Sequence, residues 1–255
     1  MMRWPRTILA LVIAVVSLTG GRFAGPGGRP GVGLGVPTAR GDDARPRLFV
    51  YLQTDEKSAS LESGLKEQLK GLEVTVFGRF RDFEEAMASN KPDAVLGLQA
   101  LMTHLGTQVA LQGQRKAQDW EPYVLVSTGG PLPATLAGKS IGVVDLLGRK
   151  GTQDFVTRLL KTPDLKLKRV TKIEDLLPLL QLSAADAVLV PAAEVKAVTE
   201  HSQLPLQVKD LPDAKVGLAS VSVLTPKWKD LVVKEVQALR ADTNKVLGVD
   251  KWRVE

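Results

Sequence analysis

The sequence contains no cysteine and only two histidines among its 255 residues. The lack of cysteine excludes disulfide bonds, thiol catalysis, zinc–thiolate sites and a lipid anchor on an N-terminal cysteine. The motifs G-x-S-x-G, H-E-x-x-H and G-x-x-x-x-G-K-[ST] are also absent, and His104 and His201 lie far apart in the chain. We therefore do not expect an enzyme, and we expect no cofactor and no metal site.

Acidic residues are missing from the first 41 residues, which hold five arginines. The chain as a whole has 34 Lys and Arg against 28 Asp and Glu, a net charge of +6. Subtracting the five arginines leaves 29 basic against 28 acidic residues, so the rest of the chain is nearly neutral. The high isoelectric point is therefore no evidence for nucleic-acid binding, and we expect no nucleic-acid partner.

The first 41 residues have the order of a secretory leader. A short basic stretch at 1–6 is followed by an apolar run at 7–18 (TILALVIAVVSL). This run is shorter than the roughly 20 residues that a membrane-spanning helix needs. Gly, Pro and Arg then dominate as far as residue 46, which is typical of a flexible spacer. We predict a signal peptide and spacer at 1–41 and a periplasmic protein; an uncleaved membrane anchor is the alternative.

The remaining chain alternates between apolar strand patterns and helical patterns. The first series predicts strands at 47–53, 73–77 and 93–98, with helices at 58–70, 80–89 and 100–111 and a loop at 112–121. The second series predicts strands at 122–127, 140–144, 166–170 and 186–190, with helices at 152–161, from about 175, and at 191–200. Further strands at 206–208 and 215–224 precede a last helix that starts at Pro226.

Two consecutive series of this kind predict an α/β protein with two lobes, each a mostly parallel sheet flanked by helices. We place the first lobe at 47–125 plus 210–255 and the second lobe at 126–209. Ligands of such proteins bind at the carboxyl ends of the strands, in the cleft between the lobes.

The best candidate for an anion site is the turn before the predicted helix at 152–161. Gly148 and Gly151 let the backbone come close to a ligand, and Arg149 adds positive charge. Thr152 would begin the helix, whose N-terminus attracts anions. The alternative is a solvent-exposed turn in which Thr152 only caps its helix.

Other polar residues follow the predicted strands and complete the predicted ligand site. Thr54 and Ser58 follow the first strand, where the alternative role is to cap the next helix. Gln99 follows the third strand. Ser127 and Thr128 end the first strand that crosses between the lobes, where the alternative is a hinge turn that needs small residues.

Two stretches resemble a known family. Residues 122–160 read PYVLVSTGGPLPATLAGKSIGVVDLLGRKGTQDFVTRLL, and residues 176–194 read LLPLLQLSAADAVLVPAAE. The order of crossing strand, Leu-x-Gly-Lys, strand and glycine-rich loop resembles the type 2 periplasmic binding proteins, in particular the phosphate- and phosphonate-type substrate-binding proteins of ABC transporters. The chain departs from that pattern at 146–147 and 149–150, where Leu-Leu and Arg-Lys replace part of a hydroxyl-rich loop.

This resemblance implies an exported, monomeric solute-binding protein that captures a small anionic solute, such as phosphate or a phosphonate, by lobe closure. Its partner would be the permease of an ABC-type transporter in the inner membrane. The alternative is an envelope accessory or protein-interaction module that has the same fold and a degenerate cleft.

Overall fold

The computed structural model describes residues 45–53, 56–200 and 202–255. These residues all belong to one compact unit that spans residues 43–255. The predicted signal peptide and spacer at 1–41 and the predicted site residue Thr54 lie outside the described residues.

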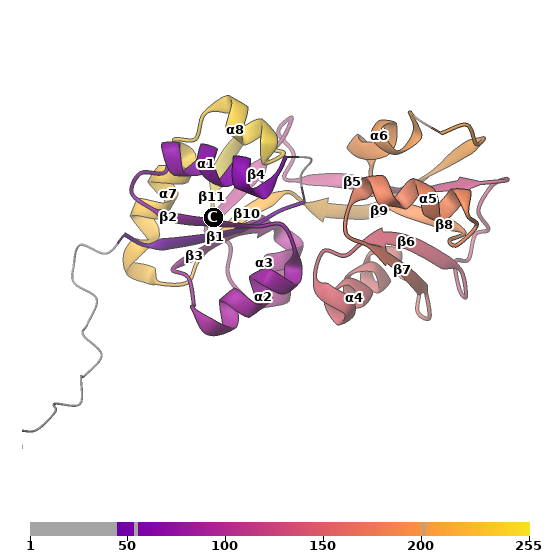
Figure 1. The fold of residues 1–255 in the computed structure, drawn as a ribbon, viewed down its shortest axis with the longest axis horizontal. Coiled ribbons are helices and arrows are strands. Elements are labelled where there is room, and N and C mark those ends of the chain that lie inside the picture. Colours follow the sequence, from indigo (N-terminus) through magenta and orange to yellow (C-terminus); the bar gives the residue numbers. More distant parts are fainter. Residues whose placement is uncertain (1–44, 54–55, 201) are drawn as a thin grey trace, which may run out of the picture. The chain divides into compact units, whose positions relative to one another are not determined.

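The first lobe is built on a six-stranded sheet with the strand order β11-β4-β10-β3-β1-β2 (Figure 1). Its strands are β1 (Arg47–Tyr51), β2 (Glu73–Phe77), β3 (Ala94–Leu98), β4 (Leu111–Gln114), β10 (Ala219–Val223) and β11 (Lys251–Val254). Its helices are α1 (Ser58–Gln68), α2 (Phe80–Ser89), α3 (Gln99–Leu105), η3 (Pro226–Trp228), α7 (Lys229–Gln237) and α8 (Ala241–Val246). β1 pairs in parallel with β2 and β3, whereas β10, β4 and β11 add antiparallel pairings.

Both faces of this sheet are buried, because successive side chains of a strand point to opposite faces. Leu48 and Val50 of β1 belong to a cluster that includes apolar residues of α1 and α7. Phe49 and Tyr51 belong to a different cluster, which includes residues of α2 and α3. Figure 1 shows α1 and α7 on one side of the sheet and α2 and α3 on the other.

The second lobe is built on a five-stranded sheet with the order β7-β6-β8-β5-β9. Its strands are β5 (Trp120–Thr128), β6 (Ser140–Val144), β7 (Lys166–Val170), β8 (Ala187–Pro191) and β9 (Leu206–Gly217). Its helices are α4 (Gly148–Leu160), η1 (Ile173–Asp175), α5 (Leu176–Gln181), η2 (Ala192–Glu194) and α6 (Val195–Thr199). β6 is parallel to β7 and β8, whereas β5 is antiparallel to β8 and β9. Residues of α5 and α6 cluster on one face, and residues of α4 on the other.

The chain passes between the two sheets twice, after β4 and after β9. The two passages lie side by side, because Trp120 is opposite Gly217 and the Leu218 N–H donates to the Asp119 carbonyl at 2.9 Å. The boundaries that we placed near residues 125 and 210 fall inside β5 and β9.

The predicted two-lobed α/β architecture is confirmed, and both sheets are mixed. Four details of the predicted elements are wrong. Residues 111–114 form β4, where we predicted the end of a helix and the start of a loop. α4 begins at Gly148, not at Thr152, and β9 is one strand from Leu206 to Gly217. α8 and β11 were not predicted. β4 has a weak local pattern (LQGQ), and it is a strand because it pairs with both β10 and β11.

Candidate functional site

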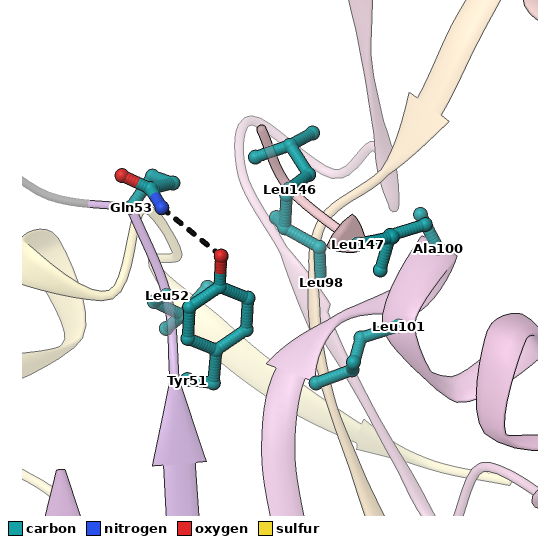
Figure 2. Close-up of a pocket in the computed structure, with 8 residues that line it drawn as sticks. All are labelled: Tyr51, Leu52, Gln53, Leu98, Ala100, Leu101, Leu146 and Leu147. Carbon is teal, nitrogen blue, oxygen red and sulfur yellow. Dashed lines mark hydrogen bonds between the residues drawn. The ribbon is translucent and has the colours of Figure 1, made fainter. Parts of the chain in front are cut away.

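The carboxyl ends of β1 and β3 in the first lobe and of β6 in the second meet at one narrow cleft. It is lined by Tyr51, Leu52, Gln53, Leu98, Ala100, Leu101, Leu146 and Leu147 (Figure 2). The first three residues follow or end β1, the next three surround the junction of β3 and α3, and the last two connect β6 to α4. The free volume is about 10 Å³, which is about the space that one water molecule needs. The cleft is therefore closed in this structure.

The contact that closes the cleft is apolar and continuous across the lobes. One cluster of buried side chains contains Tyr51 and Phe83 of the first lobe together with Leu146, Leu147 and Phe155 of the second. Leu147 is only 3% exposed. The two inner faces thus form a single hydrophobic core, and none of the described residues that line the cleft is charged.

Tyr51 provides a polar bond across this core. Its hydroxyl donates to the Asp145 carbonyl of the other lobe at 3.3 Å and accepts a hydrogen bond from Gln53 Nε2 at 3.1 Å. Burial raises the pKa of Tyr51 to about 12, and the nearby Asp145 carboxylate acts in the same direction. Tyr51 is therefore neutral at physiological pH and can act as a hydrogen-bond donor.

Two glycines bring the start of α4 against the helices of the first lobe. Gly148 has a φ of +70°, and a Cβ added there would lie 3.0 Å from Phe80 Cδ1 of α2. A Cβ added at Gly151 would lie 2.9 Å from His104 Cε1 of α3. In this closed arrangement the predicted anion turn faces the other lobe, and its glycines serve close packing between the lobes.

No protein-family model matches the sequence, and no curated protein matches it. Solved structures do match. The GluR0 ligand-binding core from Nostoc punctiforme in complex with L-glutamate is 15% identical, with a TM-score of 0.53, and the match covers 80% of this chain and 96% of that one. The substrate-binding protein of an amino acid ABC transporter is 15% identical, with a TM-score of 0.52, covering 79% and 97%. Truncated arginine-bound ArgBP from T. maritima is 18% identical, with a TM-score of 0.52, covering 77% and 97%.

The fold is that of the type 2 periplasmic binding proteins. This confirms the predicted fold, since the matches cover about four fifths of this chain and nearly the whole of the solved structures. At these identities the likeness concerns the fold.

Thr152 lies in the second turn of α4 and is completely buried. Its hydroxyl donates to Asp145 Oδ1 at 2.7 Å and accepts a hydrogen bond from the Leu147 N–H at 3.0 Å. Arg169 pairs with the other oxygen of Asp145 at 3.3 Å. Thr152 therefore holds the segment between β6 and α4 in place, whereas the side chain of Arg149 is exposed.

Replacing Thr152 by valine should lower the free energy of unfolding by about 1–3 kcal/mol, because the Leu147 N–H loses its acceptor in a buried place. Urea denaturation measures this change. Thr157→Val is the control: Thr157 is half-buried on the same helix, and its hydroxyl makes no hydrogen bond within the described ranges. Equal losses in the two variants would show that the Thr152 hydrogen bonds do not matter.

Ser127 and Thr128 are not brought together with the turn at α4. β5 is antiparallel to β8, and Ser127 is opposite Ala187, the first residue of β8. These two residues therefore lie at the edge where β8 begins, away from the cleft. The Ser127 hydroxyl instead donates to the Gly130 carbonyl at 3.4 Å. Our prediction placed the end of the crossing strand at the cleft, but β5 starts near the crossing and ends at the far edge.

Ser58 and Gln99 each begin a helix of the first lobe. Ser58 starts α1 and contacts Gly78, where an added Cβ would lie 2.6 Å from its hydroxyl. Gln99 starts α3, and its side chain lies against Gly217, where an added Cβ would lie 1.8 Å from Gln99 Oε1. Gln99 is thus beside β9 and outside the closed cleft.

None of the residues that line the cleft was among the predicted site residues. Gln53 ends the first predicted strand, and its amide reaches the Tyr51 hydroxyl. Leu146 and Leu147 had been noted only as a departure from a hydroxyl-rich loop. That departure was the available signal, because two leucines at a strand exit indicate an apolar contact there.

The described residues contain no helix that is both long and apolar enough to span a membrane. Within the same residues no group of three or more His, Asp or Glu side chains is arranged to hold a metal ion.

Proposed function

We propose that the chain is an exported solute-binding protein that captures a small anionic solute between its lobes and delivers it to an ABC-type transporter of the inner membrane. The observation that carries this proposal is the convergence of the strand ends of both lobes on one cleft, with only two passages of the chain between the lobes. Solved proteins of this fold include one that holds arginine and one that holds glutamate.

The preference for an anion rests on the start of α4. Arg149 and Lys150 are exposed there, and the helix N-terminus carries a partial positive charge. No carboxylate lines the cleft among the described residues. A solute with negative charge is therefore favoured over a cation, and phosphate and phosphonates are the first anions to test.

The solute can enter only when the lobes separate, because the closed cleft has no room for it. Separation uncovers the Tyr51 hydroxyl, the Gln53 amide and the first N–H groups of α4, which are suitable partners for an oxyanion. Exposing Leu146 and Leu147 to water costs roughly 3–6 kcal/mol. Part of the binding free energy of the solute is used to separate the lobes from this apolar closed state. The apparent affinity for the solute is therefore lower than its affinity for the separated lobes.

The test is a titration of the full chain with phosphate, methylphosphonate, sulfate, glutamate and arginine, followed by thermal shift and calorimetry. We expect at least one anion to raise the melting temperature, and the variant R149A/K150A to bind it about tenfold more weakly. K166A/K168A, which removes two exposed lysines of β7, is the control with the same change in charge. Binding of arginine alone would contradict the anion preference, and no binding at all would contradict solute capture.

A second candidate is a binding module that acts through its surface and keeps its cleft closed. The apolar core that runs across the two lobes favours this candidate, because it holds the closed state without a solute. In that case no solute in the panel binds, and the distance between the lobes stays the same throughout the titration.

A further inference from the structure

A second hollow of about 320 Å³ lies outside the cleft, between α3, the last turns of α4 and the end of β9. Only Ala100 lines both hollows. The apolar part of its lining consists of Ala100, Phe155, Leu159 and Val216. We call this hollow the basic groove. Its volume is within the range of small-molecule sites, about 300–1,000 Å³.

The charged part of the lining is mainly positive. Arg158, Lys161 and Lys215 line the groove together with a single carboxylate, Asp213. Lys161 pairs with Asp213 at 2.8 Å, and this pairing lowers the pKa of Asp213. Across residues 45–53, 56–200 and 202–255, no carboxylate lies within ion-pair distance of Arg158 or Lys215. The groove therefore has two cations without an ion-pair partner among these residues, and the charge of Lys215 also acts at longer range on Asp213.

The position of Lys215 is fixed by a neighbouring aromatic ring. Its Nζ lies 4.1 Å from the centre of the Trp120 ring, in a cation–π contact. Trp120 is at the start of β5, and Lys215 is on the adjacent strand β9. The ammonium group is therefore held at the groove in advance, which lowers the entropy cost of binding an anion.

Two neutral polar groups complete the groove. The Gln99 side chain lies against Gly217, and its amide offers both a donor and an acceptor. The Thr103 hydroxyl donates to the Gln99 carbonyl at 3.1 Å, and its oxygen can still accept a hydrogen bond. Any side chain at Gly217 would displace Gln99, so the shape of this part depends on the glycine.

We propose that the basic groove binds an amphipathic carboxylate, with the carboxylate at Arg158 and Lys215 and an aliphatic or aromatic group on Phe155, Leu159 and Val216. The lining explains both parts of this ligand: two cations without an ion-pair partner favour an anion, and an apolar wall favours a hydrocarbon group over a hydrated inorganic ion. The inference goes beyond the proposed function, because the groove is separate from the cleft in which that solute would bind.

The walls of the groove come from both lobes: α3 belongs to the first lobe, whereas α4 and β9 belong to the second. The side chains that hold the carboxylate and the hydrocarbon group belong to the second lobe, and a ligand that also bonds to Gln99 or Thr103 of α3 binds only when the lobes are together. It therefore shifts the population towards the closed arrangement and raises the melting temperature. A solute in the cleft has the opposite requirement, because it needs the lobes to separate.

The test uses the full chain with benzoate, hexanoate, inorganic phosphate and the neutral benzyl alcohol, with calorimetry as the readout. We expect benzoate and hexanoate to bind at millimolar concentration and R158A/K215A to weaken both by about tenfold. Gly217→Ala, which changes no charge, should weaken them as well because it displaces Gln99. K166A/K168A is again the control, and we expect it to bind both carboxylates as the wild type does.

The outcomes separate this proposal from the solute-binding proposal. If benzoate and hexanoate did not bind, or if R158A/K215A left their binding unchanged, the proposal that the basic groove binds carboxylates would be wrong. If R158A/K215A weakened the binding of phosphate and of benzoate equally, the proposal that the ligand is an amphipathic carboxylate would be wrong. An anion whose affinity falls in R149A/K150A but stays the same in R158A/K215A binds in the cleft. This result supports the proposed function whether or not the basic groove binds carboxylates.

Discussion

Replacing Gly151 by valine should force the two lobes apart and lower the free energy of unfolding by about 1–3 kcal/mol. The reason is the lack of space at this residue. A Cβ at Gly151 would lie 2.8 Å from Leu147 Cβ and 2.9 Å from His104 Cε1, and valine adds two methyl groups beyond it. Leu147 is buried and its Cβ is fixed to the backbone, whereas the His104 ring is exposed and packs edge-on against Phe80 at 5.7 Å. The contact with His104 is relieved when α4 moves away from α3, whereas the contact with Leu147 lies within the second lobe and contributes to the loss of stability.

The natural sequence is convenient for measuring this movement, since it contains no cysteine. Spin labels on Glu84→Cys in α2 and Gln181→Cys in α5, which are both exposed, report the distance between the lobes. We expect the distance distribution in Gly151→Val to shift to longer values and to broaden. Urea denaturation of the same variant gives the loss of stability.

Gly64→Val is the matched control for this experiment. Gly64 lies inside α1 and has no atom within 4 Å of an added Cβ. Valine there should leave the distance unchanged, and its stability should stay the same or rise slightly, because glycine is a poorer helix former than valine. If Gly151→Val keeps the wild-type distance, the glycine is not the reason for the close approach of the lobes.

The architecture was predictable from the sequence because local patterns of apolar and polar residues determine its main strands and helices. Apolar runs of four or five residues at β1, β3 and β8, separated by amphipathic helices, lead to parallel strands with helices on both faces. β4 and β11 were not predictable in this way. They are short strands with polar residues, and their only reason to be strands is the pairing with each other and with β10.

The site was predictable only in part, since the role of a glycine-rich turn depends on what lies opposite to it. Gly148 and Gly151 permit a close approach, but their local sequence does not say whether a phosphate, Phe80 or His104 is the neighbour. The placement of Ser127 shows a second limit. Local patterns reveal a strand but not its direction within a sheet, and the antiparallel pairing with β8 places this residue at the opposite edge.

Alkaline solution should destabilise the protein between pH 10 and pH 12 through its two tyrosines. Tyr51 and Tyr123 are 3% and 5% exposed. Burial raises the pKa of Tyr51 from 10.0 to about 12, and it also raises the pKa of Tyr123. Below pH 10 both residues are neutral in the folded and the unfolded chain, and their contribution to stability is fully present. Above pH 10 the unfolded chain loses protons while the folded chain keeps them, so stability falls as pH rises.

The expected loss in the free energy of unfolding from Tyr51 alone is about 2.7 kcal/mol once the pH has risen from 10 through 12. Phenolate absorbance follows the ionisation of the tyrosines directly, and Tyr51 and Tyr123 are the two tyrosines of the chain. In a Tyr123→Phe variant the signal belongs to Tyr51, and it should appear near pH 12 in the folded protein and near pH 10 in urea. Adding Gly151→Val should bring the folded value down towards 10, because water reaches Tyr51 when the lobes separate. A folded Tyr51 that already titrates near pH 10 without that substitution would mean that the cleft is hydrated, and the apolar closure on which the second candidate function depends would be wrong.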